Sequence, residues 1–470
     1  MTGIKMSFSA FLVVLILLTG CSVGKKYQRP QITAPPEFRS APAGTTSAAS
    51  LADEKWFQVF KDPQLQELVR KALVNNYDLR EAVARVEASR AQLGITRADQ
   101  LPTITSSAGV TTERFASTGS FPIPQGAKQT RTFGEVGLNL LSFELDIWGR
   151  LRMATEASRA ELLSSEETQR AVVTTLVSDV ATAYFHLLEL DSELEIAKRT
   201  LASREDSLRL IKSRESVGVA STLDVRQAEQ LVEVAGEAIP AIEQNITQTE
   251  NQIRLLMGES PAPITRNLSL IQQEQPPSLP VGLPSALLER RPDIRAAEQN
   301  LIASNALIGV ARAAYFPQIS LTGLLGFQSN QLSSLFTGQN KTWQFAPQIA
   351  QPIFTGGRLR SNVKFAEAEQ KIALVQYERS IQTAFREVSD SLVQYEKVRD
   401  VRGRQEKLVG TLQDRSRLSY VRYRGGVDTL LNALDADRDL FDAELRLAQL
   451  RRDELVTVVQ LYRALGGGWQ

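Results

Sequence analysis

Two side chains dominate a search for covalent or acid–base chemistry in this sequence. Cys21 is the only cysteine and His186 the only histidine among 470 residues. One cysteine cannot form an intramolecular disulfide, and one cysteine with one histidine provides no Cys/His cluster of the spacing that a zinc site needs. His186 lies beside the apolar Leu187 in a helical pattern, which favours a packing or surface histidine over a general base. The sequence also lacks a phosphate loop and a Ser/His/Asp constellation, so it predicts no catalytic residues, no metal and no cofactor.

Cys21 follows a stretch typical of an export signal. Lys5 precedes an apolar run over residues 8–18, which is much shorter than the roughly 20 residues of a membrane-spanning helix. The letters LTGC from Leu18 fit the lipobox of bacterial lipoproteins. We therefore expect a lipoprotein signal peptide over residues 1–20 and an S-diacylglycerol and N-acyl modification, such as palmitate, on Cys21, because a durable anchor needs more than one acyl chain. An ordinary secretory signal with a chance cysteine is the alternative.

The charges of the chain are balanced, with 54 Lys and Arg against 53 Asp and Glu. A balanced chain has no basic footprint for nucleic acid, and this class of partner is excluded. Residues 21–55 are rich in Pro, Ala, Ser and Thr. This composition predicts an extended, acylated N-terminal segment, and a helical pattern begins near Trp56.

The rest of the chain is a tandem duplication. The stretch DLREAVARVEASRAQLGITRADQLPTIT from Asp78 matches DIRAAEQNLIASNALIGVARAAYFPQIS from Asp293 at an offset of 215, and WGRLR from Trp148 matches GGRLR from Gly356 at an offset of 208. The matches define a first repeat over 56–260 and a second over 284–467. Each repeat reads as one helix, two strands and two long helices.

The long helices carry a heptad pattern. Apolar residues step by four and three along 173–187, and they do so again along 381–395. This period predicts a left-handed coiled coil. A helix from residue 149 to about residue 211 is roughly 95 Å long at 1.5 Å per residue. In the last helix Arg438 falls on a seam position, and Pro240 is expected to kink or break the final helix of the first repeat.

The two strands of each repeat have two different faces. They are predicted at about 101–115 and 132–147, and at about 316–328 and 342–354. Apolar and polar residues alternate most clearly in the second repeat, as expected for a wall with lipid on one side and water on the other. A phase slip at Leu140 and Leu141 and the proline at Pro347 predict bulged or irregular segments.

The number of strands bears on the assembly. Four strands cannot close a membrane barrel, and an open edge in hydrocarbon leaves backbone groups unsatisfied. Copies of the chain must therefore share one barrel. Two copies would give eight strands with an interior filled by side chains, and three would give twelve strands with room for a pore.

Several longer motifs occur together in the chain: ERRPDIRAAEQNL from Glu289, FELDIWGRLR from Phe143, PIFTGGRLR from Pro352, RYRGGVDTLLNALDADRDLFDAE from Arg422 and LYRALGGGW from Leu461. In combination they resemble the outer-membrane efflux protein family, the TolC-like channel components of tripartite efflux pumps, and especially its lipoprotein branch. The resemblance extends over nearly the whole chain after Cys21.

This resemblance implies a mostly α-helical homotrimer with a twelve-stranded β-barrel in the outer membrane and a twelve-helix coiled-coil α-barrel in the periplasm. It implies an exit duct that conducts substrates passively from an inner-membrane transporter, of the proton-driven RND type, and a periplasmic adaptor protein. The cell outer membrane is the expected location. Two other interpretations stay open: a lipid-anchored coiled-coil spacer without a pore, and a type I protein-secretion channel of the same fold. The residues do not separate drugs, metals, lipids or a polypeptide as the exported substrate, and the resemblance to the lipoprotein branch favours multidrug or solvent export.

The resemblance places the closed end of the duct at the turns between the long helices. These turns are SVGVAST around Gly218 and RGGVDT around Gly426. Glycine at a helix end is also explained as a simple C-cap, because a left-handed conformation costs it little. The resemblance adds a contact with the adaptor at both tips, formed by Val217, Gly218 and Val219 and by Gly425, Gly426 and Val427.

The resemblance also implies a periplasmic gate at Leu431, Asp435 and Arg438, within LLNALDADR. With three copies around an axis, Asp435 forms a ring of like charges and Leu431 an apolar collar. Arg438 lies three residues after Asp435, close enough for an ion pair that offsets the repulsion. The alternative is that the aspartates of this helix merely form a solvated face: Asp428, Asp435, Asp437, Asp439 and Asp442.

Overall fold

The structure is a computed structural model that describes residues 23–39, 50–116, 126, 128–274 and 280–469. Cys21 and the predicted signal peptide lie outside the described residues, as does most of the turn-like loop between the first two strands. The chain divides into two compact units. Unit 1 comprises residues 1–31, 86–164 and 297–377, and unit 2 comprises residues 32–85, 165–296 and 378–470.

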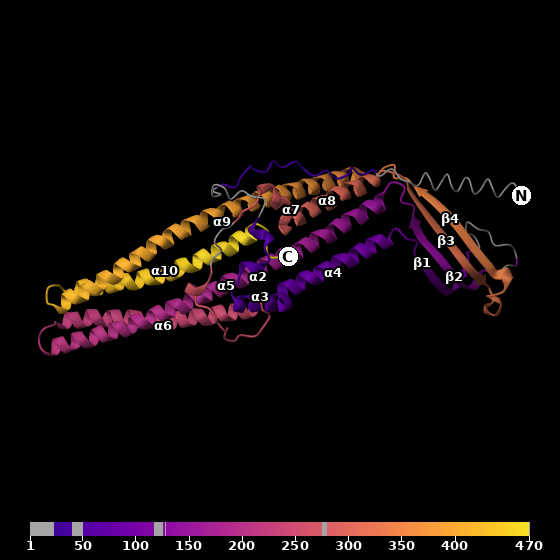
Figure 1. The fold of residues 1–470 in the computed structure, drawn as a ribbon. Helices are drawn as coiled ribbons and strands as arrows, with labels where there is room; N and C mark the ends of the chain where they lie inside the picture. Colours follow the sequence, from indigo (N-terminus) through magenta and orange to yellow (C-terminus); the bar gives the residue numbers. More distant parts are fainter. Residues whose placement is uncertain (1–22, 40–49, 117–125, 127, 275–279, 470) are drawn as a thin grey trace. The chain divides into compact units, whose positions relative to one another are not determined.

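The two repeats contain the same series of elements, labelled in Figure 1. In the first repeat these are α4 (Tyr77–Ala98), β1 (Ile104–Arg114), β2 (Thr130–Glu144), α5 (Arg150–Ser216) and α6 (Thr222–Leu256). In the second they are α8 (Pro292–Ala313), β3 (Gln318–Ser329), β4 (Lys341–Ala350), α9 (Arg358–Arg424) and α10 (Leu430–Ala464). The helices α5 and α9 both have 67 residues, and α6 and α10 both have 35. At 1.5 Å per residue, α5 and α9 are about 100 Å long.

Short elements connect the repeats and precede the first one. They are η1 (Leu51–Asp53), α2 (Trp56–Val59), α3 (Pro63–Asn75), η2 (Leu270–Gln272), η3 (Pro284–Ala286) and α7 (Leu287–Arg290), with η4 (Leu332–Ser334) and η5 (Gly338–Asn340) between β3 and β4. Helix α3 begins where the sequence dictates it: Asp62 accepts hydrogen bonds from the backbone N–H groups of Gln64 and Leu65, and Pro63 occupies the first helical position.

The four strands of unit 1 form one antiparallel sheet in the order β1-β2-β3-β4 (Figure 1). Leu138 pairs with Leu325, and Leu325 pairs with Trp343, so apolar residues share one face. The next row pairs Asn139 with Leu324 and Leu324 with Gln344 on the other face, which carries most of the polar side chains. The register shifts between Leu140 and Phe143, which is where the alternation of the sequence slips.

The core of unit 2 lies around the middle of α5, the last turns of α10 and the short N-terminal helices. Tyr184 and Tyr462 are fully buried there, and the ring of Phe60 packs edge-on against Tyr462. An apolar 18-residue window of α5 is long enough to cross a membrane, but 61% of that window is buried within the fold. Its apolar side chains therefore belong to the core.

Pro240 does not end α6, which runs unbroken from Thr222 to Leu256. The expectation of a helix break there is wrong. Proline removes one backbone hydrogen bond, but its neighbours Ala238, Ile239 and Ile242 pack into an apolar cluster with side chains of α5 and α10. This packing holds the helix together across the missing bond.

Candidate functional site

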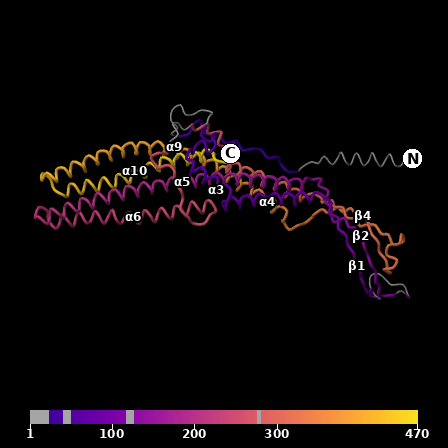
Figure 2. Tube along the Cα trace, turned by 60° about the horizontal axis from the view of Figure 1, so that its bottom comes forward, coloured from indigo at the N-terminus to yellow at the C-terminus, as the bar shows by residue number. Residues whose placement is uncertain are grey.

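The two turns between the long helices of unit 2 lie at the same end of the helix pairs (Figure 2). Gly218 and Gly426 adopt left-handed backbone conformations with φ of 78° and 73°. Each glycine is followed by a valine whose N–H bonds back to the helix: Val219 to the carbonyl of Arg214 at 2.8 Å, and Val427 to that of Arg422 at 3.1 Å. This pattern closes the carboxyl ends of α5 and α9, which explains the requirement for glycine without a ligand.

Both turns also present apolar side chains to the outside. Val217, Val219 and Val427 are 72%, 63% and 66% exposed. Solvent-exposed valines at a loop tip gain nothing from the capping pattern, so their presence favours a contact with another molecule. Among the predicted tip residues, Gly425 does not adopt a left-handed backbone conformation.

The predicted gate residues lie together on one exposed face of α10. Arg438 Nη1 lies 3.3 Å from Asp435 Oδ1, and Leu431 is 51% exposed one turn earlier. Arg438 also approaches Asp439 at 3.6 Å, and Asp439 in turn pairs with Arg415 of α9 at 2.7 Å. Ion pairs of such exposed groups stabilise by about 0.2–1 kcal/mol each. The arrangement is an apolar residue followed by a weakly held charge pair.

The opposite face of α10 carries a buried ion pair that sequence reasoning missed. Arg204 Nε of α5 lies 3.0 Å from Asp437 Oδ2, and the Arg204 side chain is only 2% exposed. Arg204 Nη1 donates to the carbonyl of Leu231 in α6 at 2.8 Å, and its guanidinium lies 5.0 Å from the ring centre of Phe441. Burial raises the pKa of Asp437, and the hydrogen bond from Arg204 acts against that rise.

Asp437, rather than Arg438, is the residue of this turn that faces the neighbouring helices of the chain. Arg438 is 56% exposed, so the prediction that it occupies the seam within the chain is wrong. The view of all five aspartates as one solvated face is also wrong for Asp437. A strict heptad places position 438 on the seam, but positions 437 and 438 lie on either side of the line from Leu434 to Phe441, and the contact with Arg204 falls on position 437. A signal was present in Phe441, a seam residue four positions after Asp437 and hence on the same helix face.

The helix tips of unit 2 are joined by a second contact. Ile211, Val225 and Ala228 from α5 and α6 pack against side chains at the end of α9 and the start of α10: Tyr423, Leu430 and Leu434. The guanidinium of Arg214 lies 4.8 Å from the ring centre of Tyr423. The two helix pairs are therefore connected at their tips by one apolar cluster and by two arginines of α5.

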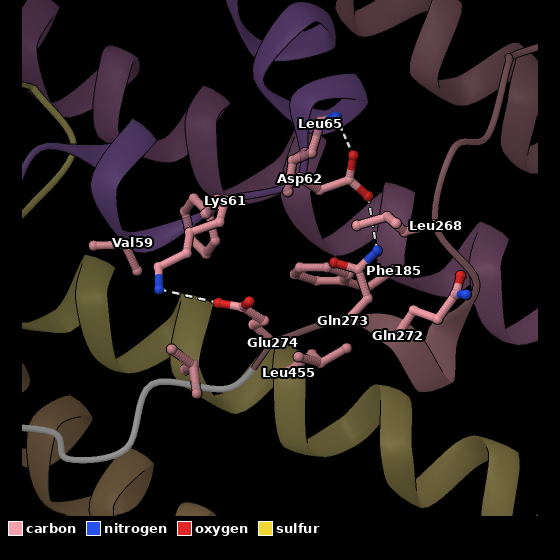
Figure 3. A pocket seen from close by; sticks show the side chains of 12 residues that line it. Val59, Lys61, Asp62, Leu65, Phe185, Leu268, Gln272, Gln273, Glu274 and Leu455 are labelled. Carbon is pink, nitrogen blue, oxygen red and sulfur yellow. Dashed lines mark hydrogen bonds and ion pairs between the residues drawn. The ribbon is translucent and has the colours of Figure 1, made fainter.

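A cavity of about 230 Å³ lies in unit 2 at the start of α3, lined by side chains such as Phe185, Leu268 and Leu455 (Figure 3). The carboxylate of Asp62 borders it but is already occupied. It accepts hydrogen bonds from the Tyr184 hydroxyl at 2.9 Å and from Gln273 Nε2 at 2.7 Å, besides its bonds to α3. This carboxylate organises the connection between the repeats and is not free to act as an acid or base.

His186, the only histidine, makes a structural contact as well. Its Nδ1 lies 2.7 Å from Glu189 Oε2 on the same helix. Within the described ranges, no cluster of three or more His, Cys, Asp or Glu side chains could hold a metal ion. The candidate site of this protein therefore consists of surfaces: the helix tips and the sheet.

The sheet of unit 1 exposes its apolar face. Trp343, Phe345 and Ile349 of β4 are 72%, 60% and 72% exposed, and Leu138 and Leu325 are about half exposed at 53% and 51%. Strands whose alternate residues are apolar and outward-facing match a wall that meets lipid on one side. The edges of the sheet, β1 and β4, each pair with only one neighbour in the described part of the chain.

Comparison with known proteins decides what kind of wall this is. The family model of the outer membrane efflux protein matches residues 68–259 and 283–467, one match for each repeat. The chain belongs to the outer membrane efflux protein family. Among its relatives is the toluene efflux pump outer membrane protein TtgF of Pseudomonas putida, 41% identical over 464 residues, which cover 97% of this chain and 95% of TtgF.

Other members of the outer membrane efflux protein family are similar over comparable lengths. The cation efflux system protein CusC of Escherichia coli is 38% identical over 461 residues, covering 97% of this chain and 98% of CusC. The open state of the outer membrane channel MtrE of Neisseria gonorrhoeae superposes with a TM-score of 0.87 at 32% identity, covering 96% of this chain and 99% of MtrE. The predictions of a TolC-like fold, an efflux channel in the outer membrane and a protein that is not an enzyme are confirmed.

Proposed function

We propose that three copies of this chain form the outer membrane duct of a tripartite efflux pump. The observation that carries the proposal is the four-stranded sheet, which has an exposed apolar face and two edge strands that each pair with one neighbour among the described residues. In a membrane such edges must be paired, and only copies of the same sheet offer matching strands. Three copies give twelve strands, which is enough to surround an aqueous channel, whereas eight strands leave an interior filled by side chains.

The tips of the helix pairs are the proposed contact with a periplasmic adaptor. Two turns with exposed valines at one end of unit 2 support this assignment. The adaptor in turn connects the duct to an inner-membrane transporter, which we propose is of the proton-driven RND type. TtgF is named for toluene efflux and CusC for cation efflux, so the relatives do not point to one substrate. A passive duct takes its specificity from the transporter that feeds it.

Two further assignments follow from the sequence motifs. Cys21 is proposed to carry the N-acyl and S-diacylglycerol groups that anchor the mature chain in the outer membrane. Leu431, Asp435 and Arg438 are proposed to line the periplasmic gate, and their exposure on one face of α10 supports this role. Because the Asp435–Arg438 pair is exposed and lies within one helix, it stabilises by only about 0.2–1 kcal/mol.

Conductance in planar bilayers tests the proposal. The purified protein should form trimers and open channels, and the Asp435→Ala/Arg438→Ala variant should show a higher single-channel conductance. The matched control is Arg446→Ala, an exposed arginine further along the same helix, paired only with Gln449 among the contacts described. Protein that is monomeric and electrically silent in every lipid would refute the duct and favour a lipid-anchored spacer. Normal channels with an unchanged conductance in the double variant would refute the gate assignment alone.

The alternative of a type I protein-secretion channel is separable in cells. Deletion of the gene should sensitise the bacterium to small toxic compounds if the duct serves an efflux pump. If the deletion leaves every compound tolerated but abolishes export of a polypeptide, the secretion alternative is correct. Recovery of an adaptor protein with the purified channel, lost on replacing Val217 and Val219 by Asp, checks the proposed tip contact.

A further inference from the structure

The sheet of unit 1 has two different ends. The helices α4, α5, α8 and α9 are attached to its strands at one end (Figure 1). Arg114, where β1 ends, and Lys341, where β4 begins, lie at the other end, which we call the far end. The duct proposed above directs the long helices into the periplasm, so the far end of the sheet lies in the outer leaflet of the membrane.

The two segments that connect the strands at the far end are basic. Residues 114–130 and 329–341 contain one arginine and two lysines but neither aspartate nor glutamate. The whole chain is balanced, with 54 Lys and Arg against 53 Asp and Glu, so the excess of positive charge at the far end is local. An excess of this sign at a membrane surface attracts anionic groups of the surrounding lipid.

The apolar face of the sheet ends in two of these cations. Arg114 and Lys341 are the only charged residues that the four strands place on this face, because every acid of the strands lies on the opposite face. Both side chains are exposed, and in the part of the chain that the structure describes neither pairs with a carboxylate. Arg114 donates to Oε1 of Gln129 at 3.1 Å. The two cations are therefore available to an anion outside the chain.

The connection between β3 and β4 adds apolar side chains beside Lys341. The ring of Phe336 packs edge-on against Phe327 of the apolar face, with 5.6 Å between the ring centres. Leu332 lies against Gly134 of β2, where an added Cβ would lie 2.8 Å from Leu332 Cδ2. The connection thus folds back over the apolar face, yet Leu332 and Phe336 remain 66% and 70% exposed. Apolar side chains fixed in an exposed position next to a cation form an amphipathic surface.

We propose that this surface binds a phosphorylated glycolipid of the outer leaflet, with the chemistry of lipid A. Its acyl chains would lie on Leu332, Phe336 and Trp343, and its phosphates would meet Lys341 and Arg114. The proposal rests on the duct proposed above, which gives the sheet its orientation in the membrane. Lipid A carries phosphates directly above its acyl chains, and ammonium and guanidinium groups form strong charge-assisted hydrogen bonds with phosphate.

The position of the cations favours this lipid over a phospholipid of the inner leaflet. At the end of the sheet that joins the helices, Arg150 is paired with Glu144 at 2.7 Å and Arg152 with Asp146 at 3.2 Å. The basic groups that open α5 are therefore neutralised within the chain. The cations of the far end have no such partner among the described residues, and they lie at the level of the outer leaflet.

Binding of lipid A to the purified full-length protein tests the charged part of the surface. Native mass spectrometry of the protein in detergent resolves bound lipid by its mass. We expect Arg114→Gln/Lys341→Gln to weaken binding about thirtyfold, a factor of about five for each cation. The matched control is Arg131→Gln, an exposed arginine of the same sheet on its opposite face, which should change the affinity less than about twofold. Lipid A from which both phosphates have been removed should bind the native protein as weakly as intact lipid A binds the double variant.

A second variant tests the apolar part. Leu332→Ser/Phe336→Ser should weaken the binding of intact and dephosphorylated lipid A by the same factor, because the acyl chains are common to both. Gln339→Ser, an exposed polar residue of the same connection, is the control and should leave both affinities unchanged. Circular dichroism and sedimentation establish that each variant retains the fold and assembly of the native protein.

The outcomes separate this proposal from the duct. Equal affinity of the native protein and Arg114→Gln/Lys341→Gln for lipid A, in protein that sediments as a trimer and conducts, would refute the lipid site and leave the duct intact. Phosphatidylglycerol that binds as tightly as lipid A, with the same loss in the double variant, would overturn the glycolipid in favour of an anionic phospholipid. Protein that is monomeric and electrically silent would overturn the duct and, with it, the orientation of the sheet.

Discussion

The buried pair of Arg204 and Asp437 makes a sharp prediction about the helix tips. Replacing Arg204 by methionine keeps a long apolar stem over Phe441 but leaves the carboxylate of Asp437 buried without its partner. Removal of one member of a buried ion pair costs about 3–5 kcal/mol. At 1.4 kcal/mol for each factor of ten, local opening of the start of α10 should become about 100 to 4,000 times more frequent.

Hydrogen exchange measures this opening directly, because amide protection reports the free energy of local unfolding. We expect protection of the first turns of α10 to fall by two to three orders of magnitude in Arg204→Met. The control is Arg438→Met, which removes an exposed pair two turns or less from the same amides and should change protection less than tenfold. In the Arg204→Met/Asp437→Leu variant, most of the loss should be recovered, because no unpaired charge remains buried.

The dependence of this loss on pH follows from the pKa of Asp437. Burial raises that pKa, and Arg204 opposes the rise, so the pKa in Arg204→Met should be higher still. An aspartate whose folded pKa lies above its unfolded value destabilises the folded state when ionised, and this penalty disappears as the pH falls through the folded pKa. The variant should therefore regain protection on acidification. Equal losses in Arg204→Met and Arg438→Met, or a loss that acid does not relieve, would refute the reasoning.

Three other predictions follow from single features. Gly218→Ala should lower the stability of the α5–α6 turn by about 1–2 kcal/mol, because the φ of 78° is unfavourable for alanine. Gly236→Ala, in the middle of α6 with open space around it, should instead stabilise the helix by about 0.5–1 kcal/mol. Thermal melts followed by circular dichroism compare the two variants. Pro240→Ala should raise the melting temperature, because it restores a backbone hydrogen bond within a continuous helix; an unchanged or lower value contradicts this. Raising the salt concentration from 0.1 to 1 M should weaken the exposed Asp435–Arg438 pair, since the Debye length falls from about 10 to 3 Å. The same change should leave the hydrogen-exchange protection around the buried Arg204–Asp437 pair unaffected. Equal sensitivity of the two pairs to salt would contradict their assignment to different faces of α10.

The sequence was sufficient for the elements of the sheet but not for their pairing. Alternation of apolar and polar residues predicts strands at about 342–354, and the structure has β4 at Lys341–Ala350. The phase slip near Leu140 predicts an irregularity, and the register shift lies there. The order of the strands depends on contacts between the repeats, about 200 residues apart, and no local pattern contains that information.

The helices show a different limit. A heptad pattern predicts long coiled-coil helices, and two of them do have 67 residues. It does not fix which residue of each turn faces inward over such a length, because the helical repeat of 3.6 residues drifts from the seven-residue period. Asp437 and Arg438 lie on either side of the line from Leu434 to Phe441, and the neighbouring helices decide which of the two is buried. The predicted break at Pro240 is wrong for another reason: whether a proline ends a helix depends on the tertiary packing of its neighbours, which local propensity does not include.

The two faces of α10 differ in how strongly they resist an opening movement of the helix tips. The exposed face carries the pair of Asp435 and Arg438, which holds only weakly, and two residues later Asp437 binds the α5–α6 pair through Arg204. A rotation of α10 that turns Asp435 away from its neighbours also pulls Asp437 from Arg204, and this step costs several kcal/mol. A movement in which both helix pairs shift together keeps the buried pair, and it keeps the Asp435–Arg438 pair as well because both of these residues lie on α10. A partner that contacts both turns, around Gly218 and Gly426, favours the joint shift of the two helix pairs because it acts on both pairs at once. A partner confined to one turn moves one pair alone, so its binding must also supply the energy that breaks the buried Arg204–Asp437 pair.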